Sequence, residues 1–186
     1  TGKVTVARAR AHVTYPCGFM LIAAANPCKC GYLTDASRAC SRAPVCGEDY
    51  MGRVSGPMMD RFDVRVDVSE VHFSDLDLPP SGDTSVLVAE RVERARARQT
   101  ARYANIDGVR VNAQAEGPLL DEVATPDAEG AAFLARAAQK FRLSARGYHR
   151  VLRVARTIAD LEGAETVRRS DIAEAVGLRV AQLPPP

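Results

Sequence analysis

The stretch that decides the fold class is FMLIAAANP, residues 19–27. Its apolar residues follow one another without alternating with polar ones, which is typical of a strand buried on both faces of a parallel sheet. Further along, residues 62–68 alternate apolar and charged side chains and predict an edge strand. We therefore expect residues 1–78 to form part of an α/β core.

A β-hairpin is predicted just before this run, over residues 3–15. Val4 and Val6 alternate with polar residues going in, and Val13 and Tyr15 do so coming out. No Asn-Gly or Gly-Gly pair marks a turn, so the tip is placed only by symmetry, at residues 8–10.

The second half, residues 83–183, predicts an all-α domain rich in Ala and Arg. Residues 79–82, PPSG, separate it from the first half, since they continue neither a helix nor a central strand. Residues 184–186, PPP, form a tail. We expect four helices, over residues 84–103, from Thr125 as N-cap with Pro126 next, over residues 144–163, and from Ser170.

The bulk composition is that of a globular protein. The chain has 186 residues, 46% hydrophobic, with a net charge of +2, so its overall charge indicates no nucleic-acid partner. No apolar run approaches the ~20 residues of a membrane span. The chain begins with Thr1 rather than Met. We expect a cytoplasmic protein without a membrane partner, and a fragment of a longer one.

Four of the five cysteines crowd together, at Cys28, Cys30, Cys40 and Cys46. Four thiolates can close a tetrahedral Zn²⁺ site, and Gly31, Pro44 and Gly47 give the loop the flexibility to wrap. The C-x-C spacing also suits free or redox-active thiols, so both interpretations stand. Cys17 is outside the cluster and is expected to be a small buried apolar residue.

Three polar residues are candidates for phosphate chemistry. Asn26 follows the apolar run, where ligand-contacting groups of α/β sheets lie, although Asn-Pro also simply begins a turn. Arg61 could stabilise charge on a transferring phosphoryl group, or pair at the surface with Asp60 or Asp63. Arg146 falls in the first turn of a predicted helix, where the helix dipole favours an anion. Arg146 and the helix N-terminus could bind a phosphate together, or Arg146 could be a solvated side chain that tolerates a small penalty.

Basic residues gather in two places. The hairpin carries Arg8 and Arg10 at its tip, where they could follow a nucleic-acid backbone. The arginines of the 84–103 helix alternate with Glu90 and Glu93 and indicate a solvated, ion-paired face.

Three motifs resemble those of the ComM/YifB family of magnesium-chelatase-like AAA+ ATPases. They are residues 24–31 (AANPCKCG), 53–63 (RVSGPMMDRFD) and 143–161 (LSARGYHRVLRVARTIADL). The resemblance implies that Asn26 is sensor 1, Arg61 an arginine finger reaching a neighbouring subunit's ATP, and Arg146 sensor 2 on a helical lid. It also implies a hairpin in the pore of a homo-hexamer, with ATP and Mg²⁺ as cofactors. Family members of the ComM type act on DNA as branch-migration helicases in natural transformation.

The sequence departs from the full family pattern in one respect. The phosphate-binding G-x-x-x-x-G-K-[ST] loop and an apolar strand ending in paired acidic residues are both absent, and we expect them upstream of Thr1. The chain alone is then expected not to hydrolyse ATP. Two alternatives remain: a magnesium-chelatase ATPase subunit, against which the cysteine cluster argues, and a non-catalytic zinc-binding interaction module.

Overall fold

The structure, a computed structural model, describes residues 2–33, 35, 37–68, 71, 73–78 and 82–180. The chain divides into two compact units, residues 1–53 and 54–186. Most of the predicted linker, residues 79–81, and the tail lie outside the described residues. The predicted boundary between an α/β part and a helical part therefore stays a prediction.

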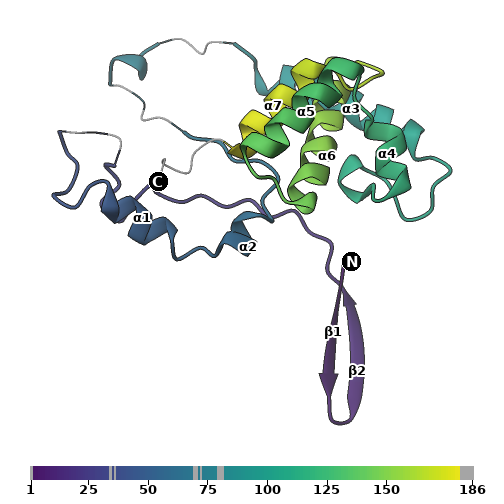
Figure 1. Cartoon of the computed structure of the whole chain (residues 1–186), viewed down its shortest axis with the longest axis horizontal. Coiled ribbons are helices and arrows are strands. Elements are labelled where there is room, and N and C mark those ends of the chain that lie inside the picture. Colours follow the sequence, from purple (N-terminus) through teal and green to yellow (C-terminus); the bar gives the residue numbers. More distant parts are fainter. Residues whose placement is uncertain are drawn as a thin grey trace. The chain divides into compact units, whose positions relative to one another are not determined.

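The first unit begins with the predicted hairpin. Strands β1 (Lys3–Arg8) and β2 (Ala11–Pro16) pair antiparallel, and Arg8 opposite Ala11 is the last pair before the tip (Figure 1). The threonines of the Thr5–Thr14 pair share a hydrogen bond of 2.9 Å across the strands. Both strands are solvent-exposed along their whole length. The hairpin prediction is confirmed, and its tip is the two residues Ala9 and Arg10.

The apolar run of residues 19–25 is not a strand, so this prediction is wrong for the structure described. Its side chains are exposed, with Ile22 81% and Met20 82% accessible. A central strand needs neighbouring strands to satisfy its amides and bury both faces. The described part of the chain has strands only in the hairpin, so it offers the run no such partner. The first unit ends with the short helix α1 (Val45–Met51).

The second unit opens with α2 (Gly56–Met59), followed by a segment that was predicted as an edge strand. Residues 62–68 form no strand, because the segment bonds to a helix end rather than to a sheet: the Arg65 amide donates to Leu178 O at 2.7 Å. A 3₁₀ turn, η1 (Phe73–Asp75), comes next.

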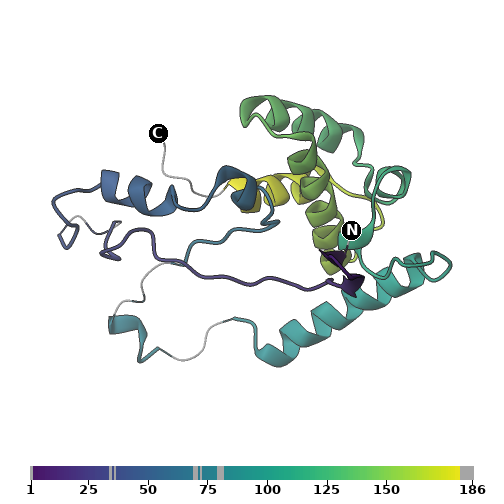
Figure 2. The same cartoon turned by 90° about the horizontal axis from the view of Figure 1, so that it is seen from below.

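Helices α3 to α7 form the core of the second unit. Helix α6 packs against α3, α4 and α7, and α7 also packs against α5; Figure 2 places α6 between α5 and α3. Buried aliphatic side chains from α4 to α7 fill the space between them, and these residues include Leu120, Leu134, Val151 and Ile172. The elements are α3 (Ser85–Arg102), η2 (Asn112–Gln114), α4 (Pro118–Ala124), α5 (Ala128–Lys140), α6 (Ala145–Glu162) and α7 (Arg169–Val180).

All four predicted helices are present, with two corrections. Helix α5 is capped by Asp127, whose side chain accepts from Gly130 N, whereas Thr125 closes the unpredicted helix α4. Asp127 is the better cap because its carboxylate reaches the third amide of the helix and also complements the positive end of the dipole. No helix of the described residues combines the length and the apolar character needed to cross a bilayer.

Candidate functional site

Three of the four cysteines of the predicted cluster come together in the first unit. The sulfurs of Cys28, Cys30 and Cys46 all lie within 4.8 Å of one another, and the Sγ atoms of Cys28 and Cys30 are 3.0 Å apart. Cys28 is fully buried, and Cys46 on α1 is 9% exposed. The helix comes close to the loop because Gly47 has no side chain: a Cβ there would stand 2.6 Å from Leu33.

Cys40 is not among the three described cysteines whose sulfurs lie within 4.8 Å of one another. The pKa of the Cys30 thiol is lowered to about 6, first because Cys28 bonds to its sulfur and then because the Tyr32 and Cys40 backbones do. The pKa of the Cys46 thiol is raised to about 12 by its bond to Cys40 and by burial. The ionised form is thus favoured at Cys30 and disfavoured at Cys46.

These features fit a tetrahedral metal ion. Sulfurs bound to one Zn²⁺ lie ~3.8 Å apart, since each Zn–S bond is about 2.3 Å. The sulfurs of Cys28, Cys30 and Cys46 lie within 4.8 Å of one another, and the Cys28–Cys30 pair, at 3.0 Å, would have to separate slightly to bind one ion. A divalent cation would supply the charge that lets several buried thiols deprotonate together. The role of Cys17 differs from expectation: it is partly exposed rather than buried.

Arg61 lies in the second unit, directly after α2. Ser55 caps that helix by accepting from Met58 N, and Pro57 fits the first turn, where no amide partner is lost. The guanidinium of Arg61 donates to Pro57 O at 2.7 Å, and the residue is exposed. The Arg61 backbone carbonyl accepts from Arg150 of α6 at 2.7 Å. The backbone is thus attached to the helices while the charged group faces solvent.

Asp60, the neighbour of Arg61, joins the same segment to two helices. Its Oδ1 accepts from Arg179 Nη2 of α7 at 2.5 Å, and its Oδ2 accepts from the hydroxyl of Ser144 at 3.0 Å. Arg179 is 5% exposed and also donates to Phe62 O at 3.2 Å. Arg150 completes the set with an ion pair to Asp63. The predicted surface pairing of Arg61 with Asp60 or Asp63 does not form, since both carboxylates bind other arginines.

Arg146 lies in the first turn of α6, as predicted. Ser144 is the N-cap and accepts from Gly147 N at 3.0 Å, and Gly163 ends the helix in the left-handed region. Gly147 is buried, and a Cβ there would stand 3.2 Å from the Arg179 guanidinium. Arg146 itself is exposed, and no carboxylate of the described residues lies within ion-pairing range of it.

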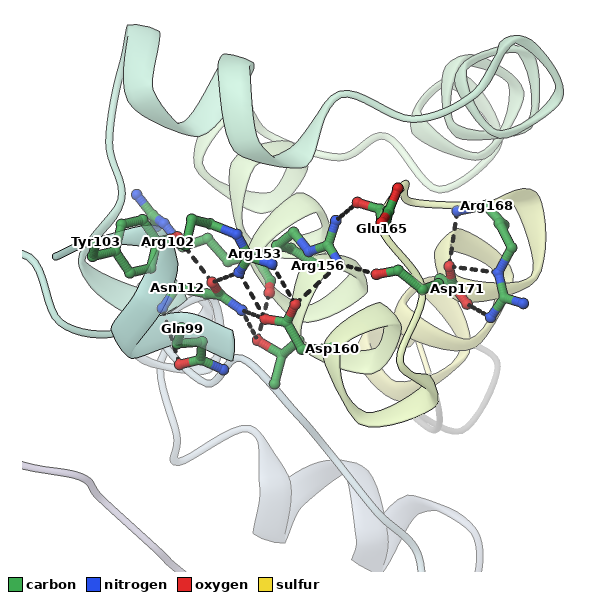
Figure 3. A network of polar contacts seen from close by, with 12 residues as sticks. Gln99, Arg102, Tyr103, Asn112, Arg153, Arg156, Asp160, Glu165, Arg168 and Asp171 are labelled. Carbon is green, nitrogen blue, oxygen red and sulfur yellow. Dashed lines mark hydrogen bonds and ion pairs between the residues drawn. The ribbon is translucent and has the colours of Figure 1, made fainter. Parts of the chain in front are cut away.

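The second unit contains a buried polar network that was not predicted from the sequence (Figure 3). Asp160 of α6 is 1% exposed and accepts two hydrogen bonds from Arg102 of α3, at 2.8 and 2.5 Å, and one from Arg156 at 3.0 Å. Asn112 donates to the same carboxylate at 2.8 Å and accepts from the Tyr103 hydroxyl at 2.8 Å. The i, i+4 spacing of Arg156 and Asp160 was the one feature of the sequence that could have indicated an ion pair here. Arg102, expected on a solvated face, instead joins α3 to α6.

The remaining candidates lie in the first unit. Asn26 is exposed and outside any regular element, and Arg8 and Arg10 are exposed at the hairpin. The structure brings Arg61 and Arg146 into one unit and Asn26 into the other.

Comparison with known proteins identifies the family. A family model described as magnesium chelatase, subunit ChlI, matches residues 1–76, and one described as magnesium chelatase, subunit ChlI C-terminal, matches residues 82–179. The chain is 34% identical to competence protein ComM of Haemophilus influenzae over 96% of its length, and 32% identical to uncharacterized protein YifB of Escherichia coli over 96%. The chain belongs to the ComM/YifB family of magnesium-chelatase-like proteins. It covers 34% of each of these ComM and YifB relatives, about a third of their length.

The chain is also 34% identical to uncharacterized protein Rv2897c of Mycobacterium tuberculosis over 96% of its length, and it spans 35% of that relative. The family recognised from three short motifs is thus confirmed over nearly the whole chain.

Proposed function

We propose that the chain is the part of a hexameric AAA+ ATPase that supplies its charge-stabilising arginines and its helical lid, and that the whole protein moves along DNA. The observation that carries this is the segment around Arg61. Its backbone is bonded to α6 and α7, and its guanidinium is exposed. An arginine whose backbone is fixed by two helices and whose guanidinium is exposed suits stabilisation of a phosphoryl group that belongs to a neighbouring subunit.

Arg146 supports the same proposal as a sensor 2 residue on the lid, and Asn26 would act as sensor 1. The sequence has no G-x-x-x-x-G-K-[ST] loop, so ATP and Mg²⁺ would have to be held mainly by another part of the whole protein. The chain on its own is then expected to hydrolyse no ATP.

The DNA part of the proposal rests on the hairpin. Arg8 ends β1 and Arg10 lies in the turn of an exposed two-stranded ribbon, and no carboxylate of the described residues forms an ion pair with either of them. Such a tip can contact the phosphate backbone in the pore of a ring. The name of the relative ComM, a competence protein, agrees with a DNA-linked role.

The test is the ATPase rate of the full-length protein with and without single-stranded DNA. The double variant Arg8→Ala, Arg10→Ala is expected to keep the basal rate and to show little stimulation. Its log–log salt slope of DNA binding should be lower by about one for each phosphate that the arginines no longer reach. Arg136→Ala, at an exposed position on α5, is the matched control. Unchanged stimulation and slope in the double variant would overturn the hairpin assignment, and an ATPase indifferent to DNA would favour the magnesium-chelatase alternative.

We also propose that Cys28, Cys30, Cys40 and Cys46 hold one structural Zn²⁺. The bound ion would fix the loop to α1 by joining ligands from both. The purified chain is expected to contain about one zinc, as is the control Cys17→Ser, whereas Cys28→Ser is expected to lose it. Wild-type chain with little zinc and freely titrating thiols would favour the redox alternative.

A further inference from the structure

Cys28 and Cys30 lie within one tight turn of the first unit. The Gly31 amide donates to Cys28 O at 3.2 Å, which closes a four-residue turn with Cys28 at its first position and Cys30 at its third. Gly31, with a φ of 85°, then continues the chain in the left-handed region. The turn brings the two side chains together, and their Sγ atoms are 3.0 Å apart.

This geometry places the two sulfurs for a covalent bond between them. A disulfide has an S–S bond of about 2.0 Å and joins Cα atoms that lie about 4.4–6.8 Å apart. Cα atoms two positions apart along a chain are separated by at most about 7 Å, and by less in a turn. Closing the gap of 3.0 Å between the sulfurs therefore takes small side-chain rotations and no rearrangement of the backbone.

The two thiols differ in their access to solvent. Cys30 is partly exposed, whereas Cys28 is fully buried. A dissolved oxidant therefore reaches the Cys30 sulfur first, and the neighbouring Cys28 thiol can then complete a disulfide. An accessible thiol beside a buried partner is the arrangement expected of a site that is oxidised reversibly.

We propose that Cys28 and Cys30 form a reversible oxidation site, at which hydrogen peroxide joins them in a disulfide. The Cys30 sulfur attacks one peroxide oxygen, the O–O bond breaks, and the second oxygen leaves as water with the thiol proton, so that Cys30 becomes a sulfenic acid. The Cys28 sulfur then attacks the Cys30 sulfur, the S–O bond breaks, and the hydroxyl group leaves with the Cys28 proton as a second water. The two thiols thus lose two electrons and two protons, and the peroxide takes up both.

The disulfide would compete with the proposed metal ion for the same sulfurs. A disulfide sulfur carries no thiolate charge, so neither Cys28 nor Cys30 would remain a ligand of the kind that Zn²⁺ binds. Oxidation would then release the ion from Cys46 as well; this part rests on the proposed function, whereas formation of the disulfide does not. Because Asn26 precedes Cys28 by two residues, the change would occur beside the proposed sensor 1. A disulfide that closes so short a loop constrains the unfolded chain little, so a dithiol reductant should reverse it.

The test is oxidation of the 186-residue chain by hydrogen peroxide, followed by alkylation of the remaining thiols, unfolding and digestion with trypsin. Lys29 separates the two cysteines, so cleavage after it places them in different peptides, residues 11–29 and 30–38. We expect these peptides to be recovered mainly as one linked species that dithiothreitol separates. Cys17 also falls in the first peptide, so the same link in Cys17→Ser assigns the bond to Cys28.

Competing pairings are seen in the same peptide map, because Cys40 and Cys46 lie on tryptic peptides of their own. A link from Cys30 to either of these instead, loss of the link in Cys17→Ser, or oxidation to sulfonic acid without any link would overturn the proposal. Zinc is measured in parallel with a chromogenic chelator. Release of zinc in step with the disulfide supports the competition, and zinc retained by disulfide-linked chains would overturn that part. A chain purified without zinc would refute the proposed metal site, while the peptide map still decides the oxidation site.

Discussion

Replacing Asp160 by Asn is expected to destabilise the helical part of the chain by about 3–5 kcal/mol. The carboxylate is buried between α3 and α6, with hydrogen bonds from Arg102, Arg156 and Asn112. Asn has nearly the same shape, so the substitution removes the negative charge without opening a cavity.

The size of this destabilisation depends on whether Arg102 and Arg156 can be rehydrated once the negative charge of Asp160 is removed. The Arg102 side chain is 21% exposed and can partly rehydrate. The Arg156 side chain is 2% exposed, and its other partners are the neutral carbonyls of Ala164 and Glu165. Arg156 would therefore stay buried without a counter-charge, which is the costly outcome of breaking a buried ion pair. A melting temperature lower by on the order of 10 °C is the corresponding shift.

The assay is urea unfolding of the chain followed by circular dichroism. Asp107→Asn, at an exposed position in a turn, is the control and is expected to stay within about 0.5 kcal/mol of wild type. If Asp160→Asn is destabilised by less than about 1 kcal/mol, with an unchanged slope against urea, the buried charge network does not stabilise the fold.

Acid, chelation and a positioning carboxylate provide three more tests. Burial alone would raise the pKa of Asp160, but hydrogen bonds from Arg102 and Asn112 and the charge of Arg156 lower it. The stabilisation by Asp160 is therefore present at neutral pH and is lost as the pH falls through the lowered pKa of the folded state. The free energy of unfolding should thus depend less on pH in the acid range in Asp160→Asn than in wild type. A zinc chelator should increase amide exchange around Cys46 and leave α6 protected. In the full-length protein, Asp60→Asn should lower the ATPase kcat about tenfold at unchanged nucleotide affinity. In the 186-residue chain, the same substitution should speed hydrogen exchange of the Arg65 amide. Wild-type values of both would refute the role of Asp60 in positioning the Arg61 segment.

Local signals in the sequence predicted local structure well. Ser144 and Gly163 marked both ends of α6, and the alternation around Val4 and Val13 indicated the hairpin, whose tip lies within the predicted residues 8–10. The approach of Cys28, Cys30 and Cys46 was also predicted, because their separation along the chain is short enough for one loop and one helix to bring them together. In each case the determining interaction lies between residues close in sequence.

Interactions between residues far apart in the chain could not be predicted from the sequence. The run at residues 19–25 is apolar enough for a buried strand, but whether it becomes one depends on neighbouring strands, not on the run. The role of Arg102 depends on Asp160, a residue 58 positions away. Asp60 looked like a surface partner for Arg61, whereas it binds Arg179, 119 positions further on. Charged residues considered singly indicate a solvated surface, and only the fold shows which of them meet.

The role of Arg61 is tested most directly by the ATPase rate of the full-length protein carrying Arg61→Ala. If Arg61 stabilises charge on the transferred phosphoryl group, kcat should fall by about 10³-fold or more, while nucleotide affinity stays near wild type. Mixing this variant with one defective in the phosphate-binding loop should restore part of the activity, because some interfaces then contain both intact parts. A full-length Arg61→Ala protein that hydrolyses ATP at the wild-type rate would contradict the assignment of Arg61 to the phosphoryl group.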